Sequence, residues 1–217
     1  MQKSAATHQY LHCAASLLLI AFLSLGTRAM ANPVINEIFY HENHGTGPEN
    51  SLTEWIELYN PSATGVDLSE WSFSQGITFT FPAGTILPGT SYLVIAADPP
   101  SFNSIHPGAD TGGNILGPWV GRLRNSGETI TLVDQAGNRI DRVRYADEGD
   151  WAERRRGPVD NGHQGWTWTA SHDGEGASLE LINPALSNNQ GQNWGSASLP
   201  VDHPVARTPF SQQIRLH

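Results

Sequence analysis

The sequence has little cysteine and few basic residues. Its 217 residues contain one cysteine, Cys13, and 12 Lys and Arg against 21 Asp and Glu, which gives a net charge of −9 at pH 7. A single cysteine allows no internal disulfide, so the fold must rely on its core. The acidic balance argues against unassisted binding to nucleic acid or to anionic membranes, because both need a basic surface. It leaves room for cation binding.

The sequence also lacks an amphipathic helix and the common catalytic motifs. After residue 31 there is no nucleophile elbow, phosphate-binding loop or His-x-x-x-His zinc spacing. Gly and Pro are abundant instead, with 22 and 14 residues, and there are seven Trp and seven Phe. This composition is typical of a turn-rich all-β protein with a substantial apolar core.

Residues 1–31 have the pattern of a secretory signal peptide. Lys3 gives a positive start, residues 11–26 are mostly apolar, and Ala29 and Ala31 form a small-x-small cleavage pattern. The alternatives are an uncleaved anchor, for which the run is short, and a buried first helix. We expect an exported protein, secreted, periplasmic or at the cell surface, with no membrane attachment after cleavage.

The rest of the sequence is organised around residues 54–73. EWIELY (54–59) alternates as a strand does, with Trp55 and Tyr59 on one face and Ile56 and Leu58 on the other. Further strand candidates, bounded by Gly- and Pro-containing turns, lie at residues 33–40, 77–81, 91–97, 129–134, 139–145 and 178–182. The pattern predicts an all-β sandwich of about seven to nine short strands over residues 32–198. Residues 199–217 show no periodicity and are predicted to be a disordered tail.

The first strand candidate carries apolar residues on both faces. Val34, Ile38 and Tyr40 fall on one face, and Ile35 and Phe39 on the other. A strand that is apolar on both faces is predicted to be central in a two-layer structure.

Two long segments show no regular alternation. Residues 98–122 and 146–176 are predicted to be irregular loops, the first with one helical turn near residues 101–105. Because function tends to lie on long loops over a rigid scaffold, the second loop is the expected place for a binding site.

Five segments, in order, resemble the lamin tail domain family in its bacterial secreted form. They are VINEI (34–38), EWIELYN (54–60) leading to Leu68 and Trp71, FPAGTILPG (81–89), LRNSGE (123–128) and GASLEL (176–181). The resemblance implies an immunoglobulin-like β-sandwich and little chemistry. In this family, animal tails act as interaction platforms, and bacterial versions resemble accessory modules of exported proteins, beside nuclease, phosphatase or spore-coat-kinase-like domains. The sequence has no basic surface with which to bind DNA.

The carboxylates Glu37, Glu54 and Glu57 lie in the two strands that match best. If these strands pair, Glu37 and Glu57 could face each other as an acid/base pair suited to glycoside chemistry. The competing and favoured interpretation is that these side chains face solvent or bind a neighbouring turn. We expect no enzyme activity, with a small hydrolase using Glu37 and Glu57 as the weaker alternative.

The 146–176 segment holds two candidate binding groups. Calcium prefers oxygen ligands from flexible acidic loops, and Asp147, Asp150, Asp160 and Asp173 could supply them. The strict spacing of a calcium loop is absent, and Arg154–Arg156 could neutralise the acids instead. No other cofactor is expected.

Three tryptophans form the second group. Trp151, Trp166 and Trp168 could present aromatic faces to sugars or to a protein partner. The alternative is that they plug the open end of the sandwich.

The sequence therefore predicts an exported, non-enzymatic binding module whose partner is a protein or an extracellular glycan or other cell-surface material. The alternative is an N-terminal accessory module of a longer exported hydrolase whose catalytic part is not in this sequence.

Overall fold

The computed structural model describes residues 32–43, 45 and 47–197. The predicted signal peptide (1–31) and the predicted tail (199–217) lie outside the described residues. None of the helices in the described ranges is long and apolar enough to span a membrane.

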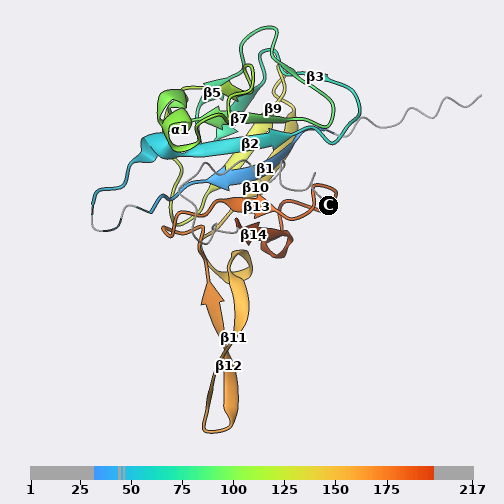
Figure 1. Cartoon of the computed structure of the whole chain (residues 1–217). Coiled ribbons are helices and arrows are strands. Elements are labelled where there is room, and N and C mark those ends of the chain that lie inside the picture. The colour runs from blue at the N-terminus through green and yellow to red at the C-terminus, as the bar shows by residue number, and fades with distance from the viewer. Residues whose placement is uncertain (1–31, 44, 46, 198–217) are drawn as a thin grey trace, which may run out of the picture.

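The described chain is a two-layer β-sandwich (Figure 1). One layer has the strand order β14-β13-β1-β2-β7-β8, in which only the β7–β8 pair is parallel. Its strands are β1 (Val34–Phe39), β2 (Trp55–Tyr59), β7 (Tyr92–Ala96), β8 (Ile115–Leu116), β13 (Leu179–Leu181) and β14 (Trp194–Ser196). The other layer has the order β10-β9-β4-β5. Its strands are β4 (Ser72–Gln75), β5 (Phe79–Thr80), β9 (Thr129–Val133) and β10 (Arg139–Arg144).

Smaller elements complete the fold. A short ribbon pairs β3 (Val66–Asp67) with β6 (Ile86–Leu87). The helix α1 (Pro99–Ile105) begins at Asp98, whose carboxylate accepts a hydrogen bond from the Ser101 N–H at 2.9 Å. Three single 3₁₀ turns are η1 (Ser51–Thr53), η2 (Gly149–Trp151) and η3 (Gly191–Asn193). The fold confirms the predicted all-β, immunoglobulin-like sandwich, with more strands than expected because several are only two or three residues long.

The core lies between the two sheets and contains side chains from alternate positions of their strands. Ile56, Leu58 and Ile95 from the larger sheet pack in one cluster with Phe73 and Leu132 from the smaller sheet. A second cluster lies on the opposite face of the larger sheet, where Phe102 of α1 covers Trp55, Val94 and Ala96. The larger sheet is therefore apolar on both faces near β2 and β7, as expected for central strands.

A bulge in β1 changes which side chains face the core, compared with what simple alternation predicts. The register with β2 shifts between Ile35 and Glu37, so Asn36 is the extra residue. As a result Ile35, Ile38 and Tyr40 all pack in the main core. The prediction that Ile35 faces away from Ile38 and Tyr40 was wrong, because one extra residue moves the following side chains to the other face.

The two predicted loops are more regular than the sequence indicated. The first contains α1, which confirms the predicted helical turn, and the short strand β8. The prediction of an irregular loop over residues 146–176 was wrong. Most of that segment is an antiparallel hairpin of β11 (Glu153–Asp160) and β12 (His163–Thr169), which projects from one end of the sandwich (Figure 1).

Candidate binding site on a projecting hairpin

The hairpin is exposed along almost its whole length. Of the residues in its two strands, only Gly157 is buried. Eight residues of extended chain span about 25 Å, so the strands carry their side chains well away from the sandwich. A lone two-stranded ribbon is marginal in water, so side-chain contacts along it and anchors at its base must support it.

Arginine and tryptophan alternate across one face of the hairpin. The register pairs Arg154 with Trp168 and Arg156 with Trp166. The Arg154 guanidinium carbon lies 4.4 Å from the centre of the Trp166 ring and 5.8 Å from that of Trp168, and the Arg156 carbon lies 4.1 Å from the centre of Trp166. Each such cation–π contact stabilises an exposed site by about 0.5–1 kcal/mol. We call these four residues the ladder face.

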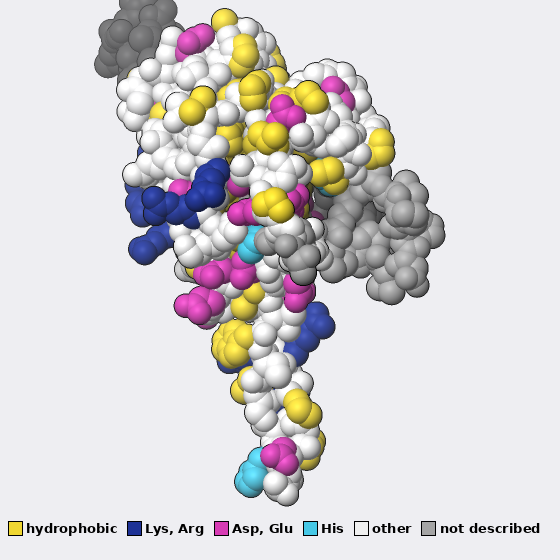
Figure 2. Space-filling view, turned by 90° about the vertical axis from the view of Figure 1, so that its left-hand side faces the viewer, with side chains coloured by type: hydrophobic (Ala, Val, Ile, Leu, Met, Phe, Trp, Pro, Cys, Tyr) yellow, Lys and Arg dark blue, Asp and Glu magenta, His cyan; other side chains and the backbone are white. Residues whose placement is uncertain are grey.

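The two ladder tryptophans remain open to solvent despite these contacts. Trp166 is 48% exposed and Trp168 is 54% exposed. Figure 2 shows basic and hydrophobic side chains together on the hairpin, and acidic side chains gathered where the hairpin joins the sandwich. The structure therefore places Trp166 and Trp168 on a surface and not in a plug at the end of the sandwich.

Trp151 serves a different part of the hairpin. It is half-buried at the hairpin base, where its ring packs at 5.7 Å, centre to centre, on Trp194 of β14. Trp194 is itself buried in the main core, and its Nε1 donates to the Asn188 carbonyl at 2.9 Å. The structure therefore does not bring Trp151 together with the other two tryptophans, but packs it on a core residue of β14.

A buried histidine joins the hairpin base to the core. His172 follows β12, and its two ring nitrogens lie 2.7 Å from the Tyr40 hydroxyl and 2.9 Å from the Trp151 carbonyl oxygen. Since a carbonyl only accepts, Nε2 carries the proton, and Nδ1 accepts from Tyr40. Burial lowers the pKa of His172, which favours this neutral form. His172, which follows β12, therefore connects the Trp151 backbone, which precedes β11, to Tyr40 in the core.

Replacing Tyr40 with phenylalanine should weaken this anchor. The change leaves His172 Nδ1 buried without its donor, so we expect a loss of about 1–2 kcal/mol in the free energy of unfolding, measured by urea denaturation. Hydrogen exchange should also quicken in β11 and β12. Tyr59→Phe is the matched control, because the described structure gives the Tyr59 hydroxyl no hydrogen bond, and it should change stability by less than about 0.5 kcal/mol. Equal losses in the two variants would contradict the anchoring role.

The four aspartates predicted to bind calcium do not converge. Asp147 lines a pocket of about 570 Å³ at the hairpin base with Glu148 and Trp168, and Asp150 lies in η2. Asp160 is at the far end of β11. Asp173 is engaged elsewhere, because its Oδ1 lies 2.7 Å from His41 Nδ1. Among the described residues no group of three or more His, Cys, Asp or Glu could hold a metal ion. Calcium binding stays a prediction.

The carboxylates Glu37, Glu54 and Glu57 are buried, so the prediction that they face solvent was wrong. For Glu54 the alternative part of the same interpretation, a hydrogen bond to a neighbouring turn, is confirmed, because it accepts from the Leu123 N–H at 2.7 Å.

Glu37 and Glu57 are cross-strand partners, and Glu180 of β13 pairs with Glu37 on its other side. One oxygen of Glu37 accepts from the Ser178 hydroxyl, and one oxygen of Glu57 accepts from Asn36 Nδ2 at 3.0 Å. The second oxygen of each has no hydrogen-bond partner.

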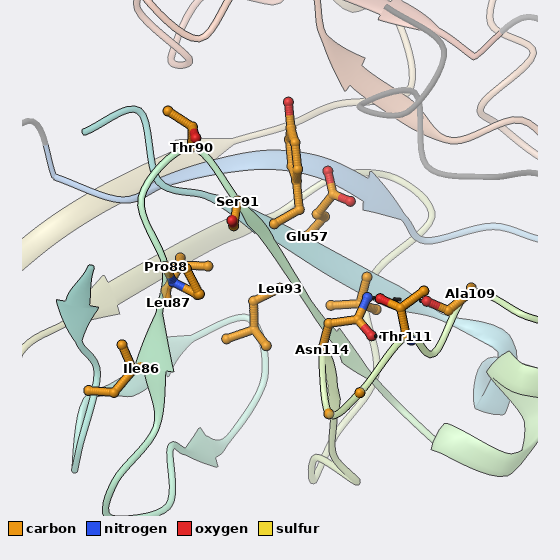
Figure 3. Close-up of a pocket in the computed structure, with 14 residues that line it drawn as sticks. Glu57, Ile86, Leu87, Pro88, Thr90, Ser91, Leu93, Ala109, Thr111 and Asn114 are labelled. Atoms are coloured by element: carbon orange, nitrogen blue, oxygen red, sulfur yellow. Dashed lines mark hydrogen bonds between the residues drawn. The ribbon is translucent and has the colours of Figure 1, made fainter. Parts of the chain in front are cut away.

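Burial raises the pKa of both carboxyls, that of Glu57 to about 8, and the neighbouring carboxylates raise the pKa of Glu37 further. Glu57 lies on the sheet beside a pocket of about 540 Å³, between the turn that carries Thr90 and Ser91 and the loop that carries Thr111 and Asn114 (Figure 3). Its side chain is nevertheless fully buried, and Glu37 is only 2% exposed. Although Glu57 lines this pocket, neither carboxyl is exposed to a molecule within it, so the geometry does not favour the hydrolase alternative.

A scan against protein families matches residues 27–147 to the Lamin Tail Domain. The match covers more than half of the chain and includes β1 to β10. This chain belongs to the lamin tail domain family. A search of the curated proteins found no match.

The family match separates the hairpin from the rest of this lamin tail domain. The matched region ends at residue 147, and the hairpin begins at Glu153. After the hairpin the chain returns to add β13 and β14 beside β1, completing the larger sheet. The ladder face therefore lies outside the part of the chain that matches the family model.

Sequence reasoning missed the two arginines as part of this surface. Arg154 and Arg156 were interpreted as neutralising nearby acids, whereas the structure stacks them on tryptophan. A signal was present, because both Arg-x-Arg and Trp-x-Trp have the period of two that places side chains on one face of a strand.

Proposed function

We propose that this lamin tail domain is an exported, non-catalytic binding module that contacts its partner through the ladder face. The N-terminal sequence pattern supports export to the cell surface, the periplasm or the medium. The observation that carries the proposal is the exposure of Trp166 and Trp168 on an element that projects from the sandwich.

Leaving two large aromatic side chains exposed to solvent is energetically unfavourable, so their exposure indicates a binding role. Large aromatic side chains usually bury most of their surface, and clustered exposed ones mark interaction sites. Trp and Arg are also the residue types that contribute most to binding energy at interfaces. The contacts with Arg154 and Arg156 hold the rings in place, so little side-chain entropy is lost when a partner binds.

Retention of the purified protein on cell-wall and cell-surface material tests the proposal. The Trp166→Ala/Trp168→Ala variant should bind at least about tenfold more weakly, because truncating a central interface tryptophan costs about 2 kcal/mol or more. Val159→Ala is the matched control, since Val159 is a 67% exposed apolar residue of the same hairpin outside the ladder face. Equal retention of the double variant and the parent would contradict the proposal.

The same experiment, repeated with calcium and with a chelator, tests the calcium prediction separately. Dependence of retention on calcium would support the calcium prediction. Equal retention under both conditions would contradict it and would leave the proposed role of the tryptophans unchanged.

A further inference from the structure

The charges on β11 are arranged differently on its two faces. Arg155 is neutralised by Glu153, with Nη2 2.7 Å from Oε2. Arg154 and Arg156 lie on the opposite face, because side chains alternate along a strand. Within the described part of the chain neither has a carboxylate partner, although the protein has nearly twice as many acidic as basic residues. The ladder face thus keeps two unpaired positive charges on an acidic protein.

The stacking determines which ligands this face can take. Two guanidinium groups lie over the Trp166 ring and one lies near Trp168. Neutral sugars and unpaired bases bind tryptophan by stacking on an open ring face, and here that space is shared with arginine. The N–H donors of these two guanidinium groups stay available, because neither arginine has a carboxylate partner among the described residues. Such planar forks match the two oxygens of a carboxylate.

The spacing of the two arginines matches the repeat of an extended polypeptide. Arg154 and Arg156 are two residues apart on one strand, so their backbone positions are about 6.7 Å apart. Carboxylates at alternate positions of an extended peptide have the same repeat and share one face.

The hairpin also offers an edge to which such a peptide can add. Among the described strands β12 has only β11 as a neighbour, so its outer backbone groups can pair with an added strand. The edge of β11 is less suitable, because it has a register shift between Arg156 and Val159 and contains Pro158, which has no N–H.

We propose that the ladder face recognises an extended acidic segment of a protein partner, in which Asp or Glu occupies alternate positions. Arg154 and Arg156 bind successive carboxylates, and the edges of Trp166 and Trp168 cover the backbone and the aliphatic parts of the segment. This inference rests on the proposed function and names the chemistry of its partner.

The test uses labelled synthetic peptides and fluorescence anisotropy with the full protein. One peptide alternates Glu and Thr, and the other carries the same number of glutamates at every third position, which puts successive carboxylates on opposite faces of an extended chain. The alternating peptide should bind at least about fivefold more tightly, and added salt should weaken it. This comparison uses only the unmodified protein, so it does not depend on how well any variant folds.

Matched variants then identify the residues. Arg154→Gln and Arg156→Gln should each weaken the alternating peptide about fivefold or more, and Arg155→Gln should change its affinity less than about twofold, since only the first two lie on the ladder face. Equal losses in all three variants would overturn the inference, because they would show a response to net charge alone. Preference for a polyuronate or a single-stranded oligonucleotide over the peptide would also overturn it.

The outcomes distinguish this inference from the proposed function. If neither peptide binds but cell-surface material is retained through Trp166 and Trp168, the inference fails and the proposed function stands. If protease treatment of that material abolishes retention, the partner is a protein, as proposed. If retention does not depend on the hairpin, the proposed function fails, and the inference, which rests on it, fails as well.

Discussion

The folding stability of this protein should fall as the pH rises from about 5 to about 9. The cause is the buried pair Glu37 and Glu57. Burial raises the pKa of Glu57 from an ordinary 4.5 to about 8, and it raises that of Glu37 in the same direction. Between these values the unfolded chain has released its protons while the folded chain still holds them. The folded state therefore binds more protons, and raising the pH favours unfolding until the folded carboxyls ionise as well.

The effect should be large because each pKa unit corresponds to about 1.4 kcal/mol. The rise in the pKa of Glu57 from 4.5 to about 8 alone corresponds to about 5 kcal/mol. Because the two carboxyls share a site and do not titrate independently, we expect a combined loss on the order of 5 kcal/mol and a decrease in melting temperature of about 10–20 °C. Buried Glu54, whose pKa is also raised to about 8 by burial, adds in the same direction. His172 acts oppositely, since its lowered pKa makes stability fall as the pH drops below about 6.5.

The Glu57→Gln variant isolates the carboxylate contribution. Glutamine keeps an oxygen that can accept from Asn36 but carries no charge at any pH, so the variant should be more stable than the parent at about pH 9 and similar at about pH 5. Because His172 and Glu54 are present in both proteins, their effects cancel in the difference. Exposed Glu175→Gln is the control, and its stability curve should follow that of the parent. Parallel curves for parent and Glu57→Gln would contradict the role given to burial.

Removing the hairpin should abolish binding and leave the sandwich nearly unchanged. Glu153 and Thr169 are cross-strand partners, so an Asn-Gly turn can join them directly in place of residues 154–168. The deleted strands are exposed almost throughout, and the anchoring residues Trp151 and His172 are kept. We expect the melting temperature to change by less than about 3 °C.

Retention on cell-surface material should fall at least tenfold in this deletion variant, as in the double tryptophan variant. The melting temperature and the retention, measured on the same variant, distinguish two ways in which this prediction can be wrong. A large decrease in melting temperature would mean that the hairpin is part of the cooperative fold. Undiminished retention would mean that the contact surface lies elsewhere on the sandwich.

Most of the sandwich could be predicted from the sequence, because strands with one buried face alternate between polar and apolar residues. EWIELY is the clearest case, since Ile56 and Leu58 pack in the core as predicted. The bulge at Asn36 could not be predicted in this way, because it depends on the pairing of β1 with β2 and not on the residues of β1 alone.

The candidate site could be predicted only in part. Trp166 and Trp168 were identified as candidate contact residues, but the hairpin was interpreted as a loop because its strands bury no face and so lack apolar alternation. The burial of Glu37 and Glu57 was missed for the opposite reason. Charged residues are usually exposed, and only their place in the middle strands of a six-stranded sheet buries them.

The joint between hairpin and sandwich has a consequence for the evolution of this protein. The chain leaves and re-enters the fold at neighbouring positions, Glu153 and Thr169, and the strands that complete the larger sheet follow only after it returns. Changes in the length or sequence of the intervening residues therefore do not disturb the core. If the hairpin is the contact surface, as proposed, its residues can change without changes in the core, and a different hairpin grafted at this joint should give the same scaffold a new partner.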